Sequence, residues 1–447
     1  MTAGSTAPTI PSPPAAQRGP LGRNIRNTIA ARATPAKLRL LLLGLLALSA
    51  LWGSVAASSV AGQASAARNV RAVSEPLSLD AQRIYRSLSD ADATEAAAFL
   101  SGGQEPFALR QEYQTDIAQA AHELEAATAA ASQLAAGKQL AILSAGLPVY
   151  TGYIETARAE NRLGLPLGAA YLREASGFMR GTLLPAARNV YAIENGQLAA
   201  ADQQATAVPY GAYAVALIVA VGLFSAHRWL GRRTHRVINP GLLVATVAGL
   251  VSLIWLVSAV TVASVQLAGA RDHGSAPVEE LARADIAALQ AHADESLTLI
   301  GRGGDDTFQE NFRWFQKHLG PGPGTLLTAA AAASAGSAGQ SQATSAVHAA
   351  TAWYAVHARV RLLDDGSNYA AAVKLAVGRA PTQSGGMFSR LDADLTGAMA
   401  ADQDSFASGA QAGQGALAGL EAGVIVLSLI MAAGCAWGIS RRLAEFR

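Results

Sequence analysis

The sequence predicts an all-α membrane protein. Four transmembrane helices carry two extracytoplasmic up-down four-helix bundles, related by internal duplication. Three observations predict this fold: four long stretches without charge, a helix-favouring composition between them, and motifs that recur about 200 residues apart. Hydrophobic residues make up 51% of the 447 residues and charged residues only 15%. Soluble domains carry about 25% charged residues, so this composition argues against an ordinary soluble enzyme and excludes a disordered chain.

Each apolar stretch is long enough to cross a bilayer, which takes about 20 residues. No Asp, Glu, Lys or Arg occurs in 40–67, 203–226 or 237–270, and Glu421 is the only charged residue in 405–440. The expected transmembrane helices lie at 40–60, 209–229, 240–262 and 419–440. Glu421 falls in the first turn of the last one. We interpret it as a hydrated carboxylate at the interface rather than an ion or proton site, which leaves transport with little support.

The first apolar stretch has a second interpretation, as a signal peptide cleaved near the small residues at 56–59. Its apolar run is longer than the roughly 7–15 residues of a signal sequence. An uncleaved anchor is therefore the preferred interpretation.

Basic residues indicate the orientation of the chain. The first 39 residues contain six Lys or Arg and no acid, and the connection after the second span is also basic without an acid. Residues 441–447 hold three arginines against one glutamate. We therefore expect a multi-pass membrane protein with both termini cytoplasmic. The remaining segments would be a disordered basic tail at 1–37, outer bundles at 62–207 and 270–417, a cytoplasmic loop at 230–238 and a cytoplasmic tail at 441–447.

Recurring motifs at a nearly constant offset indicate the duplication. Ala200-Ala201-Asp202-Gln203 returns as Ala400-Ala401-Asp402-Gln403, and Ala157-Arg158 returns as Ala358-Arg359. Ala, Leu, Glu, Gln and Arg dominate the outer segments, which predicts helices. In the first segment we expect breaks at 102–103, near 137, at Pro148 and at 161–168, with a last helix from Pro185. In the second segment we expect breaks at 301–304, 320–324, 362–368 and 379–386.

Motifs for catalysis and for metal binding are missing. The sequence has no phosphate-binding G-x-x-x-x-G-K-[ST] loop, no H-E-x-x-H, and a single cysteine, Cys435. His348 and His357 are too far apart in sequence to share a metal without further ligands. We expect no enzymatic activity, no catalytic residue, no cofactor, no metal and no nucleic-acid partner.

Gly415, Gly419 and Gly423 recur every four residues at the entrance to the last transmembrane helix. Such a small-residue face allows another helix to approach closely. It would serve either static packing within the chain or a contact that shifts during signalling.

Residues 150–179 are unusually polar for this Ala-rich chain. A helix would place Glu155, Arg158 and Arg162 on one face, and Gly164 and Pro166 would then interrupt it. Two interpretations remain open: an internal salt-bridge network that fixes the bend, or a site that recognises a carboxylate ligand or a partner protein. The candidate residues are Tyr153, Glu155, Arg158, Asn161, Arg162, Tyr171, Arg173 and Glu174.

The run ETARAENRLGLPLGAAYLREAS, together with the start ATPAKLRLLLLGLLALSALWG and the four-helix topology, resembles actinobacterial tandem-sensor membrane proteins of the GlnX type. The resemblance implies a location in the bacterial plasma membrane and a role in amino-acid sensing. An extracytoplasmic glutamate/aspartate-binding protein would report through such a protein to a cytoplasmic Ser/Thr kinase. The second segment keeps Arg359 but lacks the Gly-Pro break and the Tyr-Leu-Arg-Glu run. Equal roles for the two bundles are therefore in doubt.

Two functions from different classes follow. The first is a non-catalytic transmembrane sensor or signal relay; the alternative is a structural or scaffolding protein of the cell envelope. A relay would hand its signal to a separate protein, because the cytoplasmic segments are shorter than the roughly 50 residues of a small domain. The basic residues facing the cytoplasm offer a docking surface, although membrane topology and lipid headgroup contact also explain them. These residues are Arg232, Arg233, Arg236, Arg441 and Arg442. Ligand identity, oligomeric state and effector stay open.

Overall fold

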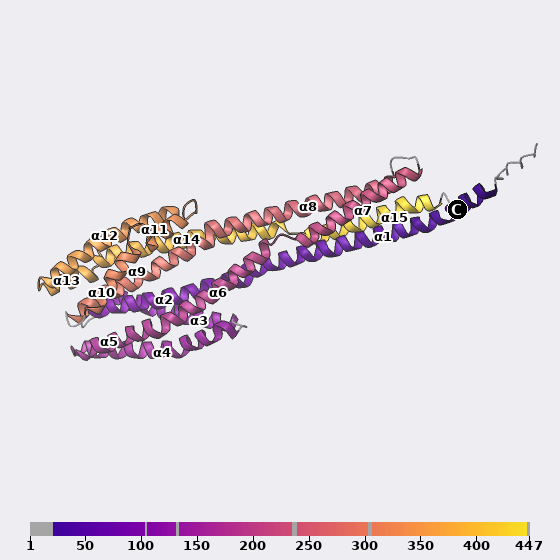
Figure 1. The fold of residues 1–447 in the computed structure, drawn as a ribbon. Helices are drawn as coiled ribbons and strands as arrows, with labels where there is room; N and C mark the ends of the chain where they lie inside the picture. The colour runs from indigo at the N-terminus through magenta and orange to yellow at the C-terminus, as the bar shows by residue number, and fades with distance from the viewer. Residues whose placement is uncertain (1–20, 103–104, 131–133, 235–238, 303–305, 445–447) are drawn as a thin grey trace, which may run out of the picture. The chain divides into compact units, whose positions relative to one another are not determined.

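The structure is a computed structural model that describes residues 21–102, 105–130, 134–234, 239–302 and 306–444. All regular secondary structure in these ranges is helical (Figure 1), which confirms the all-α class. The first half of the chain contains α1 Leu21–Asn69, α2 Glu75–Leu100, α3 Phe107–Ala130, α4 Leu134–Arg162, α5 Leu167–Phe178, α6 Leu184–Thr206 and α7 Tyr210–Thr234. The second half contains α8 Pro240–Ala270, α9 Ala276–Gly301, α10 Thr307–Leu319, α11 Leu326–Ala333, α12 Gln340–Asp365, α13 Tyr369–Val377, α14 Ser384–Ala416 and α15 Leu420–Ala444.

The chain divides into two compact units. The membrane unit comprises the residues up to Ser59 together with Pro209–Leu256 and the residues from Leu420 onward. The outer unit comprises Val60–Val208 and Val257–Gly419. Four helical runs have a window long and apolar enough to cross a membrane, which confirms the four expected spans. These runs are Lys37–Leu100, Leu167–Arg232, Pro240–Gly301 and Ser384–Arg441.

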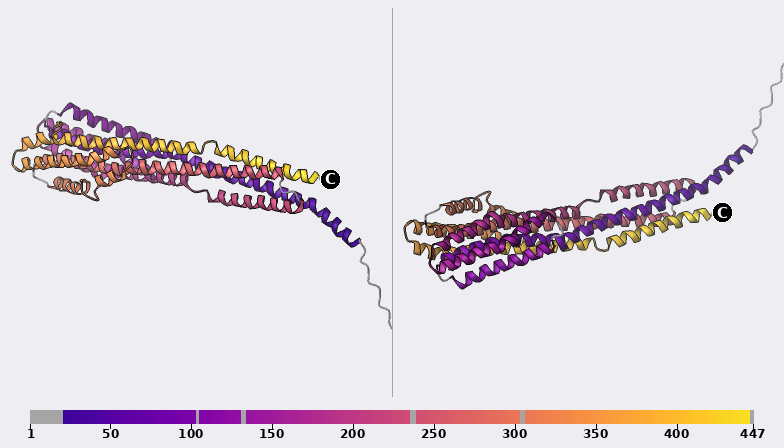
Figure 2. Two further views of the ribbon diagram at one scale, coloured as in Figure 1. Left: turned by 90° about the horizontal axis from the view of Figure 1, so that it is seen from above. Right: turned by 90° about the horizontal axis from the view of Figure 1, so that it is seen from below.

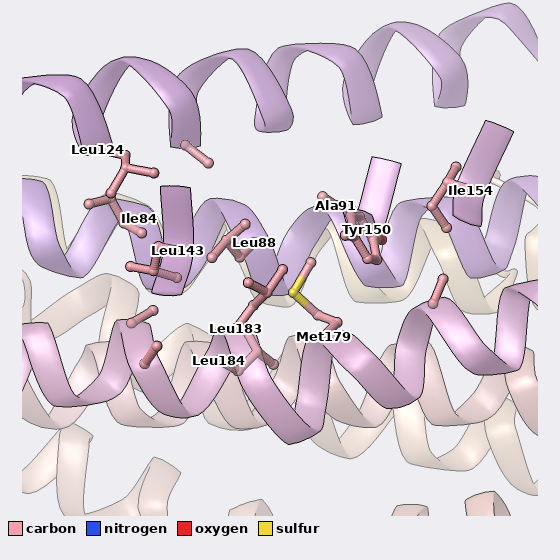
Figure 3. Packing of buried hydrophobic residues seen from close by; sticks show 14 of the residues in the cluster. Ile84, Leu88, Ala91, Leu124, Leu143, Tyr150, Ile154, Met179, Leu183 and Leu184 are labelled. Atoms are coloured by element: carbon pink, nitrogen blue, oxygen red, sulfur yellow. The ribbon is translucent and has the colours of Figure 1, made fainter. Parts of the chain in front are cut away.

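The outer unit holds both repeats packed against each other, a contact that the sequence analysis had not addressed. Helix α2 of the first repeat lies along α9 of the second, and the outer helices of both repeats run alongside one another in both views of Figure 2. Leu297 of α9 belongs to the core of the first repeat. That core gathers Leu88 from α2, Leu143 and Tyr150 from α4, and others (Figure 3). Burying each such side chain contributes about 1.5–3 kcal/mol.

Most helix ends agree with the sequence. Gly102 adopts a left-handed φ of 83° after α2, and all four expected breaks of the second repeat separate helices. Four features differ. Gly137, near which the sequence predicted a break, lies inside α4. Helix α4 continues through Pro148, residues 21–37 belong to α1 rather than to an unstructured tail, and turns at 334–339 separate α11 from α12.

Three π-helical segments interrupt the long helices: η1 Val70–Ser74, η2 Met179–Leu183 and η3 Arg271–Ser275. Each one ends two residues before a proline: Pro76, Pro185 or Pro277. Because proline has no N–H, it cannot bond to the carbonyl four residues earlier, and its ring crowds that carbonyl. The backbone widens instead, so that Glu75 N–H bonds to the Val70 carbonyl five residues back. Ala276 bonds to Arg271 in the same way, at the equivalent position of the second repeat.

Candidate functional site at the interface between the repeats

Two of the four long helical runs pass from one unit to the other without a break. These are α1–η1–α2 and α8–η3–α9. The other two are interrupted, at 207–209 and at 417–419. Within the membrane unit, Trp52 of α1 donates its indole N–H to Ser252 Oγ of α8 at 3.2 Å. Within the outer unit, α2 packs on α9. The two continuous helices therefore pair in both units.

Arg86 of α2 makes the first of two ion-pair contacts between the repeats. Its Nε donates to Asp285 of α9 at 3.0 Å, and its Nη2 donates to Asp392 of α14 at 2.5 Å. Asp90 lies 3.5 Å from the same guanidinium. Several carboxylates thus share one cation, and Asp116 of α3 lies close enough to feel their charges. Burial is the main cause that raises the pKa of Asp90 to about 7, of Asp285 to about 8 and of Asp116 to about 9. When all of its carboxyl groups are ionised, this contact therefore carries more negative than positive charge.

Arg180 of η2 makes a second contact between the repeats. It donates to Asp294 of α9 and lies 3.5 Å from Asp92 of α2, which also accepts a 2.8 Å hydrogen bond from Ser176. Burial raises the pKa of Asp92, and it raises the pKa of Asp294 to about 6 against the opposing effect of Arg180. Both arginines come from the first repeat, and each reaches an aspartate on α9.

Inside the first repeat, Arg158 of α4 is buried in an ion-pair network with only 5% of its side chain exposed. It donates to Glu95 of α2, to Glu105 at 3.0 Å and to Glu155 at 2.7 Å. Its guanidinium also lies 4.4 Å from the centre of the Tyr113 ring. Burial, reinforced by the neighbouring carboxylates, outweighs Arg158 and raises the pKa of Glu95 to about 8. Arg158 therefore serves the internal network and is not available to a ligand.

The second repeat has a buried glutamate at the corresponding place, with different partners. Glu295 Oε1 lies 2.9 Å from Nδ1 of His357 on α12, and the Ser384 hydroxyl lies within 2.8 Å of both carboxylate oxygens. Trp353 donates its indole N–H to that hydroxyl at 2.9 Å. His292 Nδ1 approaches the same carboxylate at 3.5 Å. Burial alone would raise the pKa of Glu295, but the two histidines lower it to about 2.

The other recognition candidates lie around the turn between α4 and α5. Asn161 donates to the Phe99 carbonyl at 3.3 Å, and half-buried Tyr153 packs edge-on against Phe178. Tyr171 is also half-buried, whereas Arg162, Arg173 and Glu174 are exposed. The structure thus supports the network interpretation for Glu155 and Arg158, and it leaves the exposed charges available to a partner.

The same turn exposes three leucines that we had not singled out. Leu163, Leu165 and Leu167 are 72%, 46% and 50% exposed. The LGLPL run carried a signal for this, since leucines beside Gly and Pro fall outside any helical apolar stripe. We call the exposed leucines and charged residues of 162–174 the α4–α5 tip: Arg162, Leu163, Leu165, Leu167, Arg173 and Glu174.

The helix-packing glycines have different surroundings. A Cβ on Gly423 of α15 would collide with the Trp255 ring of α8, whereas nothing lies near Gly415 or Gly419. Gly419 instead forms the turn before α15 with a φ of 74°. A Cβ on Gly241 of α8 would collide with the backbone of Gly438 of α15, so these two helices approach closely at this pair. In the sequence, Gly438 beside Trp437 is the small residue that allows this close approach.

Among the cytoplasmic candidates, Arg232 and Arg441 are exposed. Arg236 lies outside the described residues, as do the side chains of Arg233 and Arg442. In the part of the chain that the structure describes, no three His, Cys, Asp or Glu side chains are arranged to hold a metal ion.

Comparison with known families gives a match for the first outer segment. Residues 66–203 match the family model of the actinobacterial sensor domain, and they run from the end of α1 into α6. The first outer segment is therefore similar to a sensor domain. Comparisons with curated proteins and with solved structures give no match.

Proposed function

We propose that this chain, whose residues 66–203 match an actinobacterial sensor domain, is a transmembrane sensor and signal relay without catalytic activity. It would lie in the bacterial plasma membrane with both termini cytoplasmic. An extracytoplasmic amino-acid-binding protein would supply the input, and a cytoplasmic Ser/Thr kinase would receive the output, in line with the resemblance to GlnX-type proteins.

The observation that carries this proposal is the pairing of the two continuous helical runs. Helices α1–η1–α2 and α8–η3–α9 have contacts with each other in both units. A displacement of α2 against α9 has a covalent helical route to α1 and α8. Shifts of roughly 1–2 Å between packed helices are a common form of signal transmission. The π segments η1 and η3 lie at equivalent points on this route, and such segments often mark functional positions in helices.

The α4–α5 tip supports the input side of the proposal. Three exposed leucines flanked by exposed arginines form an apolar centre with a charged border. Protein interfaces concentrate binding energy in such arrangements, and arginine is among the residues enriched there. A partner bound to this tip would contact the end of α4, and Arg158 of α4 is ion-paired to Glu95 of α2.

Exposed arginines support the output side. Arg232 near the end of α7 and Arg441 near the end of α15 are both exposed. The connection between α7 and α8 is too short to fold as a domain, so a separate protein would read the displacement.

Spin labels in the membrane unit test the relay. Leu40 of α1 and Leu243 of α8 are 69% and 49% exposed, so cysteines there accept labels in a Cys435→Ser chain. In nanodiscs, adding the glutamate-loaded binding protein should shift the measured label–label distance by about 1–2 Å. The double variant Arg162→Ala/Arg173→Ala should remove the shift. The exposed Arg313→Ala of the second repeat serves as the matched control and should keep it. Partner binding without any distance change would support the scaffolding alternative instead.

A further inference from the structure

A groove of about 690 Å³ lies beside the α2–α9 pair. The first repeat lines it from α2, η2 and α6, and the second repeat from α9 and α10. Its polar lining includes Arg188 and Asn189 of α6, Gln290 of α9 and Asn311 of α10. Small-molecule sites usually have volumes of about 300–1,000 Å³ with a few convergent polar groups. We call this space the cationic groove.

Hydrogen-bond donors in the cationic groove are left unused. Arg188 is exposed and forms no ion pair with any residue that the structure describes. Arg180 also lines the groove, but its Nε and Nη2 are buried, although they lack a hydrogen-bond partner among the described residues, so the donors open to the groove are those of Arg188. Because Asp92 and Asp294 already offset the charge of Arg180, Arg188 provides the net positive charge. Guanidinium N–H groups and side-chain amides are suited to bind a carboxylate.

The groove also has an aromatic wall. Trp314 of α10 is 55% exposed, stacks on His318 at 4.1 Å and meets Phe315 edge-on. Leu184 and Pro185 of α6 add apolar surface to the lining. An indole held by its neighbours and open on one face is a surface on which an apolar or aromatic group can pack.

The equivalent space on the other side of the α2–α9 pair is closed. Leu184 and Arg188 correspond to Gly385 and Ser389 at the repeat offset of 201, and those two residues line a crevice of only about 40 Å³. That crevice is acidic, with Asp90, Glu112 and Asp392 in its lining, and an ion pair between Arg379 and Glu112 lies in its wall. Packing of the repeats can therefore fill this space with the protein's own side chains. The cationic groove is open at the position where its counterpart is closed.

We infer that the cationic groove binds a small organic carboxylate with an apolar or aromatic body. Arg188, with Asn189 and Asn311, holds the carboxylate, and Trp314 holds the body. The biological role of this site rests on the proposed sensor function. A ligand in the groove contacts α6 of one repeat and α10 of the other, and so favours one position of α2 relative to α9.

Binding is tested on the full chain in nanodiscs, by tryptophan fluorescence and thermal shift. The probes are propionate, succinate, benzoate and indole-3-acetate, each compared with its neutral amide. At least one carboxylate should bind saturably and more tightly than its amide. Arg188→Gln should weaken that binding roughly 10- to 100-fold, the effect of losing a hydrogen bond to a charged group. Trp314→Ala should weaken the aromatic probes most. Arg390→Gln, an exposed arginine outside the groove, is the control and should bind as the wild type does.

Failure of this site and failure of the sensor function give different results. If no carboxylate binds saturably, or if Arg188→Gln binds as tightly as the wild type, the groove is not the site. The label distance between positions 40 and 243 could still respond to the binding protein in that case. If a carboxylate binds through Arg188 but no stimulus moves the labels, the site stands and the relay function is wrong.

Discussion

The two repeats bury a glutamate at the same place on their central helices and neutralise it in different ways. In the first repeat, Arg158 is shared among Glu95, Glu105 and Glu155. In the second, Glu295 has His357, Ser384 and His292 to itself. Stacked rings hold both histidines, with Phe312 3.6 Å from His357 and Phe388 4.0 Å from His292. The first site has more acids than bases, whereas in the second both oxygens of the single glutamate have hydrogen-bond partners.

This difference gives the repeats different electrostatic behaviour. Burial raises the pKa of Glu95 to about 8, whereas the histidines lower the pKa of Glu295 to about 2. Of these two matched glutamates, only the one in the first repeat therefore has a pKa near neutral pH. The repeat that matches the sensor domain holds the glutamate with the raised pKa, and we call it the adjustable repeat.

The largest difference in stability should come from replacing each of the two arginines that the repeat motif pairs. Arg158 and Arg359 occupy equivalent motif positions, but Arg158 is buried and Arg359 is exposed. Arg158→Leu leaves a buried carboxylate unpaired and should destabilise the protein by about 3–5 kcal/mol. Arg359→Leu is a surface change and should stay within about 0.5 kcal/mol. Thermal unfolding of both full-length variants measures the difference, and equal losses would show that the repeats use these arginines alike.

An intermediate effect on stability should come from replacing the two glutamates, whose contributions should depend on pH in opposite directions. Glu295→Gln loses hydrogen bonds to a charged group, which should cost about 1.5–3 kcal/mol at pH 7. Because the folded pKa of Glu295 is depressed, its stabilisation is present above its ordinary pKa of 4.5 and is lost as pH falls toward 2.

Glu95 should show the opposite dependence. Its folded pKa is raised, so its contribution is complete below pH 4.5 and is lost as pH rises through about 8. Melting temperatures from pH 3 to 9 for the wild type, Glu95→Gln and Glu295→Gln check both signs. If the wild type and Glu95→Gln differ by a constant amount between pH 5 and 9, Glu95 does not titrate there.

The sequence predicted the fold because local signals dominate it. Charge-free stretches mark the spans, and Gly102 or the GPGPG run ends a helix through its own backbone preference. Pro148 shows the limit of this reasoning: α4 is held by the core around Leu143 and Tyr150 and passes through the proline without ending. Tertiary packing overrode the local preference there.

The candidate site was less predictable because its contacts join residues about 200 positions apart. Nothing local to Arg86 indicates that it reaches Asp285 and Asp392. The motif at 157–158 pointed to Arg359 as the counterpart of Arg158, yet His357, two residues earlier, faces the buried glutamate. Helix rotation decides which side chain points inward, and a repeat offset of 200 or 201 leaves that rotation undetermined.

The smallest effect on stability concerns the two prolines behind η1 and η3. Pro76→Ala restores an N–H that can bond to the Ala72 carbonyl, and Pro277→Ala does the same toward His273. Each change should alter stability by less than about 1 kcal/mol, because the widened turn already relieves the proline clash. Hydrogen exchange should slow at 70–76 or at 271–277, as an α-helical turn replaces the π segment.

The same variants decide whether the repeats transmit equally. A regular turn removes one residue from the register and so applies a torque between α1 and α2, because each helical residue turns by about 100°. The contacts of Trp52 with Ser252 and of Arg86 with Asp285 limit the rotation to a small part of that angle. If both continuous helices carry the signal, each variant should reduce the distance response between labels at 40 and 243. If the adjustable first repeat carries it alone, Pro76→Ala should abolish the response and Pro277→Ala should leave it. An unchanged response in both, with exchange slowed as expected, would mean that the π segments relieve proline strain and have no part in signalling.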